Sequence, residues 1–131
     1  MDKSQQELFF KLSMFEQQIQ NINQQIQAIE KAILDMNSLN IDLNELKEAK
    51  GKEVLSSIGK GIFIQTNIIS ENLIVDIGGK NFVKKSIPET QNIIKKQIKK
   101  LEDTKKELNQ VLEEINRGLT ETMLEHQKEK K

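Results

Sequence analysis

Two long stretches of this chain repeat apolar residues at alternating steps of three and four, and they flank a short centre rich in Ile, Val and Gly. Such spacing places the repeated residues on one stripe of an α-helix, and a stripe this long needs a partner helix to cover it. We therefore expect two helices that fold back on each other as an antiparallel coiled coil. The first stripe comprises Leu8, Leu12, Phe15, Ile19, Ile22, Ile26, Ile29, Ile33 and Met36, and the second comprises Ile87, Gln91, Ile94, Ile98, Leu101, Lys105, Leu108, Leu112, Ile115, Leu119, Thr122 and His126.

The composition favours long solvated helices over a wide globular core. Of the 131 residues, 36% are hydrophobic and 31% are charged, and Trp, Tyr and Cys are absent. The 20 basic residues balance the 20 acidic ones, which argues against a nucleic-acid partner because such binding needs uncompensated cations. The absence of Cys excludes disulfides and thiolate metal sites. We expect no membrane span and no secretion signal, and hence a cytoplasmic protein.

The pattern divides a single domain, residues 1–131, into four parts. We expect a mainly α fold, with a helix over residues 4–50, two β-hairpins over 51–86, a second helix over 87–127 and a frayed tail over 128–131. Ser4 and Glu7 have the spacing of a capping box at the start of the first helix. Ser86, followed by Pro88 and Glu89, predicts the start of the second helix.

The apolar repeat of the first helix slips once. Met36 to Leu39 is a step of three where a step of four is due, and the pattern then continues at Leu43 and Leu46. A slip of this kind overwinds a coiled coil locally. It predicts a bend or a change of packing partner near residues 36–42.

The centre is rich in β-branched residues separated by turn residues. Four strands are expected, at residues 53–58, 62–69, 73–77 and 82–85, paired as two hairpins. Two-stranded ribbons are only marginally stable in water, and these expose apolar groups on both faces, so we expect them to join chains into an oligomer. The residues expected in that oligomeric contact are Ile62, Phe63, Ile64, Ile68, Leu73, Val75, Ile77, Phe82 and Val83.

We identify no catalytic constellation. His126 is the only histidine, so no metal cluster of ordinary spacing is expected. Gly59-Lys60-Gly61 and Gly79-Lys80 lack the remaining residues of dinucleotide and phosphate loops, and we interpret both as turns. We expect no enzyme activity, no cofactor and no bound metal.

The ends of the two helices carry more apolar residues than a two-helix seam needs. Apolar groups that such a seam cannot cover indicate an interaction site, and flexible Met and aromatic side chains suit varied apolar partners. The alternative is that these residues only cap the coil or pack against a neighbouring coil. The candidate tip residues are Phe9, Phe10, Met14, Phe15, Leu119, Met123 and Leu124.

The chain as a whole resembles a prefoldin subunit, and more narrowly the α-class of archaeal type. The resemblance is carried by the order helix, two hairpins, helix and by the segments GKEVL (51–55), IGKGIFI (58–64) and LIVDIGG (73–79). Ser57 departs from the pattern, since the family often has Pro there.

The resemblance implies a hexamer of two α and four prefoldin β subunits, in which the hairpins build a double β-barrel body. It also implies an ATP-independent holdase, whose coiled-coil tips capture non-native client proteins and deliver them to a group II chaperonin. Two hairpins per subunit is the α pattern. The alternative from another class is a structural coiled-coil oligomerisation protein without client binding.

Overall fold

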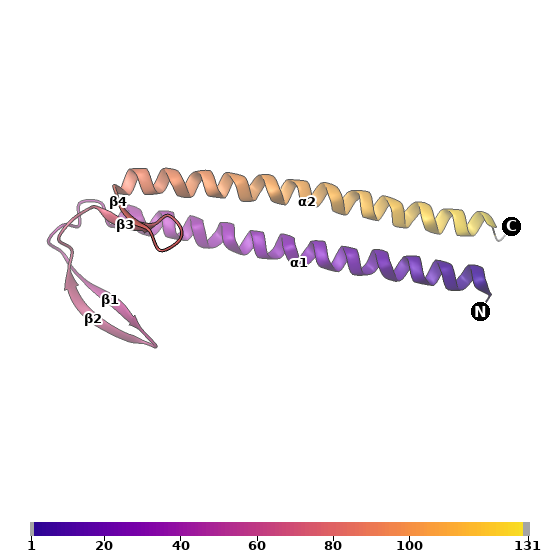
Figure 1. Cartoon of the computed structure of the whole chain (residues 1–131), viewed down its shortest axis with the longest axis horizontal. Helices are drawn as coiled ribbons and strands as arrows, with labels where there is room; N and C mark the ends of the chain where they lie inside the picture. The colour runs from indigo at the N-terminus through magenta and orange to yellow at the C-terminus, as the bar shows by residue number, and fades with distance from the viewer. Residues whose placement is uncertain (1, 130–131) are drawn as a thin grey trace. The chain divides into compact units, whose positions relative to one another are not determined.

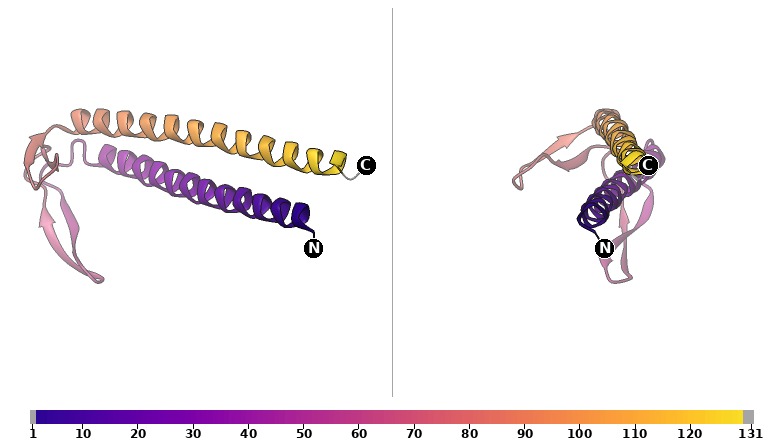
Figure 2. Two further views of the ribbon diagram at one scale, coloured as in Figure 1. Left: turned by 45° about the vertical axis from the view of Figure 1, so that its right-hand side comes forward. Right: turned by 90° about the vertical axis from the view of Figure 1, so that its right-hand side faces the viewer.

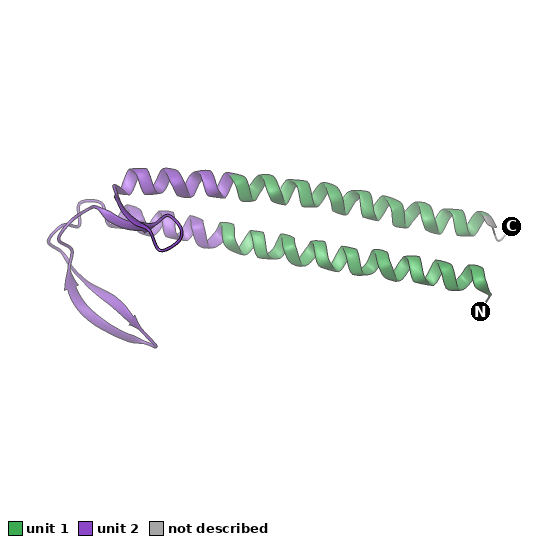
Figure 3. Ribbon diagram, viewed as in Figure 1, with its two compact units in different colours: residues 1–33, 100–131 green, residues 34–99 purple. Residues whose placement is uncertain are grey.

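The computed structural model describes residues 2–129. In chain order the elements are α1 (Lys3–Glu45), β1 (Glu53–Gly59), β2 (Ile62–Asn67), β3 (Leu73–Asp76), β4 (Phe82–Lys85) and α2 (Ile87–Glu129) (Figure 1). The predicted order of helix, two hairpins and helix is thus confirmed. The elements divide into unit 1 (residues 1–33 and 100–131) and unit 2 (residues 34–99), which we describe separately (Figure 3).

In unit 1 the first part of α1 lies side by side with the last part of α2 in antiparallel orientation (Figures 1 and 2). Lys105 Nζ forms an ion pair with Glu30 Oε1 at 3.2 Å. The Phe15 ring lies against Gly118, where an added Cβ would be 3.4 Å from the ring Cε1. Every residue of both predicted stripes, in this unit and in unit 2, is buried or half-buried. The predicted seam is therefore confirmed.

Unit 2 holds the buried core, which forms where the end of α1 meets the start of α2. Its centre is Leu43, Ile87 and Ile94, only 7%, 3% and 5% exposed. Half-buried side chains pack around these three, and Leu73 of β3 is one of them. The hydrophobic effect thus fixes the helix ends and the second hairpin to one another.

The seam of α1 does not pass through Leu39, so the slip inferred from the sequence pattern is wrong at that residue. The bend or change of packing partner near residues 36–42 stays a prediction. The seam of α1 runs through Met36, Asn40 and Leu43, which keeps the alternation of four and three, and Leu39 is exposed. The helix continues without interruption to Glu45. The side-chain amide of Gln91 on α2 donates a hydrogen bond to the backbone carbonyl of Asn40 at 3.3 Å, so polar residues meet where the sequence pattern suggested leucine.

Two of the predicted helix boundaries need correction. Asp2, rather than Ser4, caps α1, since its Oδ1 accepts a hydrogen bond from the Gln5 amide at 2.7 Å. The helix ends at Glu45, before the expected residue 50, because the chain turns through a left-handed residue, Glu48 (φ 62°). Glu71 Oε1 accepts a hydrogen bond from the amide of that residue at 2.9 Å.

At the other helix, the predicted cap is confirmed and the predicted tail is wrong in part. Ser86 Oγ accepts a hydrogen bond from the Glu89 amide at 3.2 Å, as expected for an N-cap. Lys128 and Glu129 belong to α2, where a frayed tail was expected. Residues 130–131 of that tail lie outside the described residues.

The first hairpin pairs β1 with β2 in antiparallel register, with Val54 opposite Thr66. Lys60 and Gly61 form its two-residue turn and both have positive φ, 52° and 79°. Two central residues with positive φ are typical of a type I′ turn, whose twist matches that of the flanking strands. The two glycines of Gly59-Lys60-Gly61 therefore serve the turn and the bulge beside it, as expected.

The second hairpin pairs β3 with β4, with Val75 opposite Val83. One face is half-buried and includes Leu73, which contacts the core of unit 2. The opposite face exposes Ile74 and Phe82. Within residues 2–129 the hairpins form two separate two-stranded sheets and no closed barrel.

Candidate functional site

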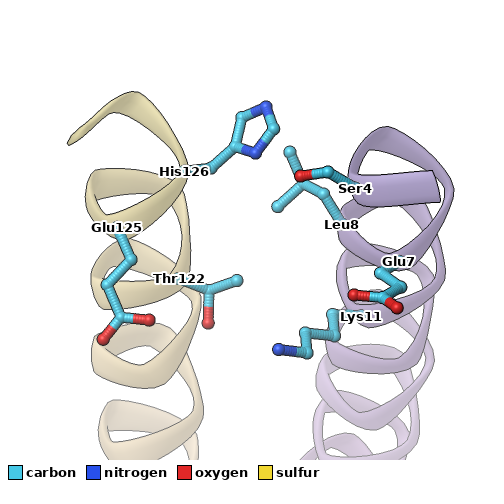
Figure 4. Close-up of a pocket in the computed structure, with 7 residues that line it drawn as sticks. All are labelled: Ser4, Glu7, Leu8, Lys11, Thr122, Glu125 and His126. Carbon is cyan, nitrogen blue, oxygen red and sulfur yellow. The ribbon is translucent and has the colours of Figure 1, made fainter. Parts of the chain in front are cut away.

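Residues 2–129 contain no cluster of three or more His, Asp or Glu side chains suited to holding a metal ion. Neither helix is long and apolar enough to cross a membrane. His126 lies half-buried in a mostly polar pocket of unit 1, where it faces Ser4 and Leu8 of α1 (Figure 4). The pocket places the first turns of α1 beside the last turns of α2, which is the arrangement that the tip prediction requires.

Most of the candidate tip residues are exposed. The exposed fractions are 64% for Phe9, 66% for Phe10, 46% for Met14, 48% for Met123 and 53% for Leu124. Phe15 and Leu119 are half-buried, because both belong to the seam. Aromatic and thioether side chains so exposed on a solvated coiled coil form an apolar surface of the kind that binds partners.

One groove follows the seam of unit 1. Phe9, Leu12 and Ile19 of α1 form one wall, and Leu119 and Met123 of α2 form the other, while Ser13 and Glu16 complete the lining. Its volume is about 390 Å³, which suits a few side chains rather than a folded domain. We call it the Phe9–Met123 groove.

The other tip residues line different hollows. Met14 and Phe15 lie in a second groove that reaches Thr122 on α2. Phe10 lines a third hollow, formed by α1 alone. Leu124 is exposed and lines none of the three. The structure therefore divides the predicted tip into separate surfaces.

Sequence reasoning missed four contributors to the Phe9–Met123 groove, of which Ser13 was assigned to neither the seam nor the tip. Leu12 and Ile19 were assigned only to the seam, although as half-buried residues they also form the groove wall. Glu16 was not singled out. The signal that could have identified Glu16 is its spacing. It lies four residues after Leu12 and three before Ile19, on the same side of the helix as Phe9.

The hairpins of unit 2 supply a second apolar surface. Of the residues predicted for the oligomeric contact, Ile62, Phe63, Ile64, Ile77 and Phe82 are exposed, and Ile68, Leu73, Val75 and Val83 are half-buried. Further exposed apolar residues that the prediction omitted are Leu55, Ile58, Ile69 and Ile74. Apolar strands with this exposure are typical of strands that pair with another chain.

Known proteins resemble this chain in part of the sequence and in the fold. Over 49 residues it is 41% identical to the prefoldin subunit alpha of Methanosphaera stadtmanae, a match that spans 37% of this chain and 36% of that relative. The structure matches a chain of filamentous PFD from Methanocaldococcus jannaschii, determined by cryo-electron microscopy. This match has a TM-score of 0.81 and 20% identity, and it covers 88% of this chain and 97% of that one.

The family comparison covers most of the sequence. The prefoldin subunit family matches residues 15–131, which include both hairpins, all of α2 and most of α1. The resemblance seen in the sequence is thereby confirmed. The chain belongs to the prefoldin family.

Proposed function

We propose that this chain is a subunit of an ATP-independent holdase chaperone that captures non-native proteins through the apolar surface of unit 1. The observation that carries the proposal is the exposure of Phe9, Phe10, Met14 and Met123 at the paired ends of the two helices. Membership of the prefoldin family supports it. Non-native proteins expose apolar segments, and such segments gain free energy when they cover apolar side chains.

Capture of this kind needs no covalent bond to be made or broken. A few exposed side chains on one subunit bind weakly, but several subunits joined in one particle bind the same client together, and avidity raises the total affinity. We propose that the apolar hairpin surface joins this chain to prefoldin β subunits, in a particle of two α and four β chains. The particle would deliver its clients to a group II chaperonin.

The experiment compares two triple variants in the particle assembled with β subunits. The tip variant changes Phe9, Phe10 and Met14 to Ser. The matched control changes Leu34, Leu39 and Ile41 to Ser. The control residues lie on the same helix outside the tip and have similar exposure, 67%, 49% and 62%. Light scattering reports suppression of the aggregation of a chemically denatured client, and mass measurement reports whether the particle is intact.

We expect the tip variant to lose most of its suppression while the particle keeps its mass, and the control to behave as the unaltered protein. Equal suppression by the tip variant would contradict client capture at this surface. It would leave the alternative, a structural coiled-coil oligomerisation protein without client binding. Loss of suppression in both variants would show that exposed apolar residues along α1 bind clients, and not those of the tip alone.

A further inference from the structure

We infer that the Phe9–Met123 groove binds a single amphipathic α-helix of the client, with basic residues along one edge, rather than an extended segment. The inference rests on the proposed function and specifies the conformation and charge of what is captured. The helix would lie along the seam between α1 and α2 of unit 1 and place its apolar face between Phe9 and Met123.

The shape of the groove favours a helix. Its wall on α1 runs from Phe9 to Ile19, about 15 Å at 1.5 Å per residue, and Leu119 and Met123 stand one turn apart on α2. Two neighbouring helices form ridges and grooves into which a ridge of a third helix packs. Over about 15 Å a helix of about ten residues presents about four side chains on one face, whereas an extended segment of about five residues presents only about two or three.

The seam beneath the groove is incompletely covered. Leu12, Ile19 and Leu119 are only half-buried, and in the described part of unit 1 Ile26 is the only stripe residue that is buried. Two helices therefore do not complete the burial of this seam. A third helix would cover the same side chains that line the groove.

Charge distinguishes this groove from the hollows beside it. Glu16 is the only charged residue among those that line the Phe9–Met123 groove. Lys11 lines both the groove at Met14 and the hollow at Phe10, where Lys3 and Glu7 also lie. A basic side chain at the edge of a bound helix would therefore be favoured next to Glu16 and not at the neighbouring hollows.

The test measures the binding of labelled peptides to the assembled particle by fluorescence anisotropy. The reference peptide is an amphipathic helix of about 14 residues with Leu at positions i, i+3, i+4 and i+7 and Lys along one edge. A second peptide carries Glu in place of Lys. A third peptide has the sequence of the first except that its two central residues are Pro. We expect the Pro peptide to bind at least tenfold more weakly and the Glu peptide about threefold more weakly.

Met123 and Leu39 provide the matched variants. Met123 lines the groove, Leu39 lies on α1 outside the tip, and their exposed fractions are almost equal, 48% and 49%. Met123→Ser should weaken binding of the reference peptide severalfold, whereas Leu39→Ser should leave it unchanged. Glu16→Lys should reverse the preference between the Lys and Glu peptides, an effect that a general loss of structure would not produce.

Several outcomes would overturn the inference while client capture at the tip still stands. The Pro peptide could bind as tightly as the reference peptide, or Leu39→Ser could weaken binding as much as Met123→Ser. Self-association of particles that Met123→Ser abolishes would show that a second copy fills the groove. Failure of the proposed function is recognised separately, by the unchanged aggregation suppression of the Phe9, Phe10 and Met14 variant.

Discussion

The two units differ in how deeply they bury the seam between α1 and α2. In unit 2 the seam closes over Leu43, Ile87 and Ile94, and the Gln91 amide finds hydrogen-bond partners across it. In unit 1 the same heptad repeat continues, but its side chains, apart from the buried Ile26, stay half-buried, and exposed aromatic residues flank them. Burial in unit 2 stabilises the pairing, while unit 1 keeps apolar surface available.

The reason for the difference is the third layer. In unit 2 the second hairpin adds Leu73 to the helix pair, and a third element allows core side chains to lose almost all contact with water. The described part of unit 1 is a pair of helices alone, and there the two-helix seam leaves every stripe residue except Ile26 partly exposed to water. The most deeply buried side chains of the repeat thus lie mainly in unit 2, whereas unit 1 leaves its apolar side chains partly exposed.

The largest expected effect tests this comparison with one substitution at two places on α1. Leu43→Ala should lower the free energy of unfolding by about 3 kcal/mol, because it removes a buried side chain and leaves a cavity. Leu12→Ala should cost about 1 kcal/mol, because Leu12 is already half in water. Urea unfolding followed by circular dichroism measures both.

Leu108→Ala, at another half-buried seam position in unit 1, serves as the control and should resemble Leu12→Ala. Equal losses for Leu43 and Leu12 would contradict the view that unit 2 holds the stability.

The sequence predicted the helices, the hairpins and the seam because those depend on local periodicity. It could not predict that Asn40 replaces Leu39 in the seam, because the seam keeps its alternation of four and three through Met36, Asn40 and Leu43 although Asn40 is polar. The Gln91 amide donates to the backbone carbonyl of Asn40, which any residue type would offer. It also grouped Phe9 and Phe10 into one tip. The two are adjacent in sequence, but they lie about 100° apart around the helix, so they line different hollows.

The next effect compares the polar pairs that cross the seam in each unit. In unit 2 Gln91, 9% exposed, donates to Asn44 Oδ1 at 2.7 Å. In unit 1 the pair of Lys105 and Glu30 is well exposed, with side chains 37% and 52% exposed. A double-mutant cycle with Ala should give a coupling energy of about 1 kcal/mol for the first pair and at most about 0.5 kcal/mol for the second.

Salt separates the two pairs further. Raising NaCl to 1 M should remove the coupling of the exposed ion pair and leave that of the neutral amide pair nearly unchanged. A larger coupling for Lys105 with Glu30 than for Gln91 with Asn44 would break the comparison.

The smallest effect concerns the two helix caps. Ser86→Ala should cost about 1 kcal/mol, since Ser86 starts α2 directly beside the buried Ile87 and local fraying there would expose the core. Asp2→Ala should lower the free energy of unfolding by about half as much or less, because the first turn of α1 covers little apolar surface and frays at little cost.

Hydrogen exchange at the Glu89 and Gln5 amides reports each cap directly. Ser86→Asp, which keeps an acceptor at the cap, should restore most of the protection. If Asp2→Ala proved the costlier change, the first turn of α1 would have to be more firmly packed than its exposure indicates, and the exposed apolar surface of unit 1 would be more rigid than this comparison implies.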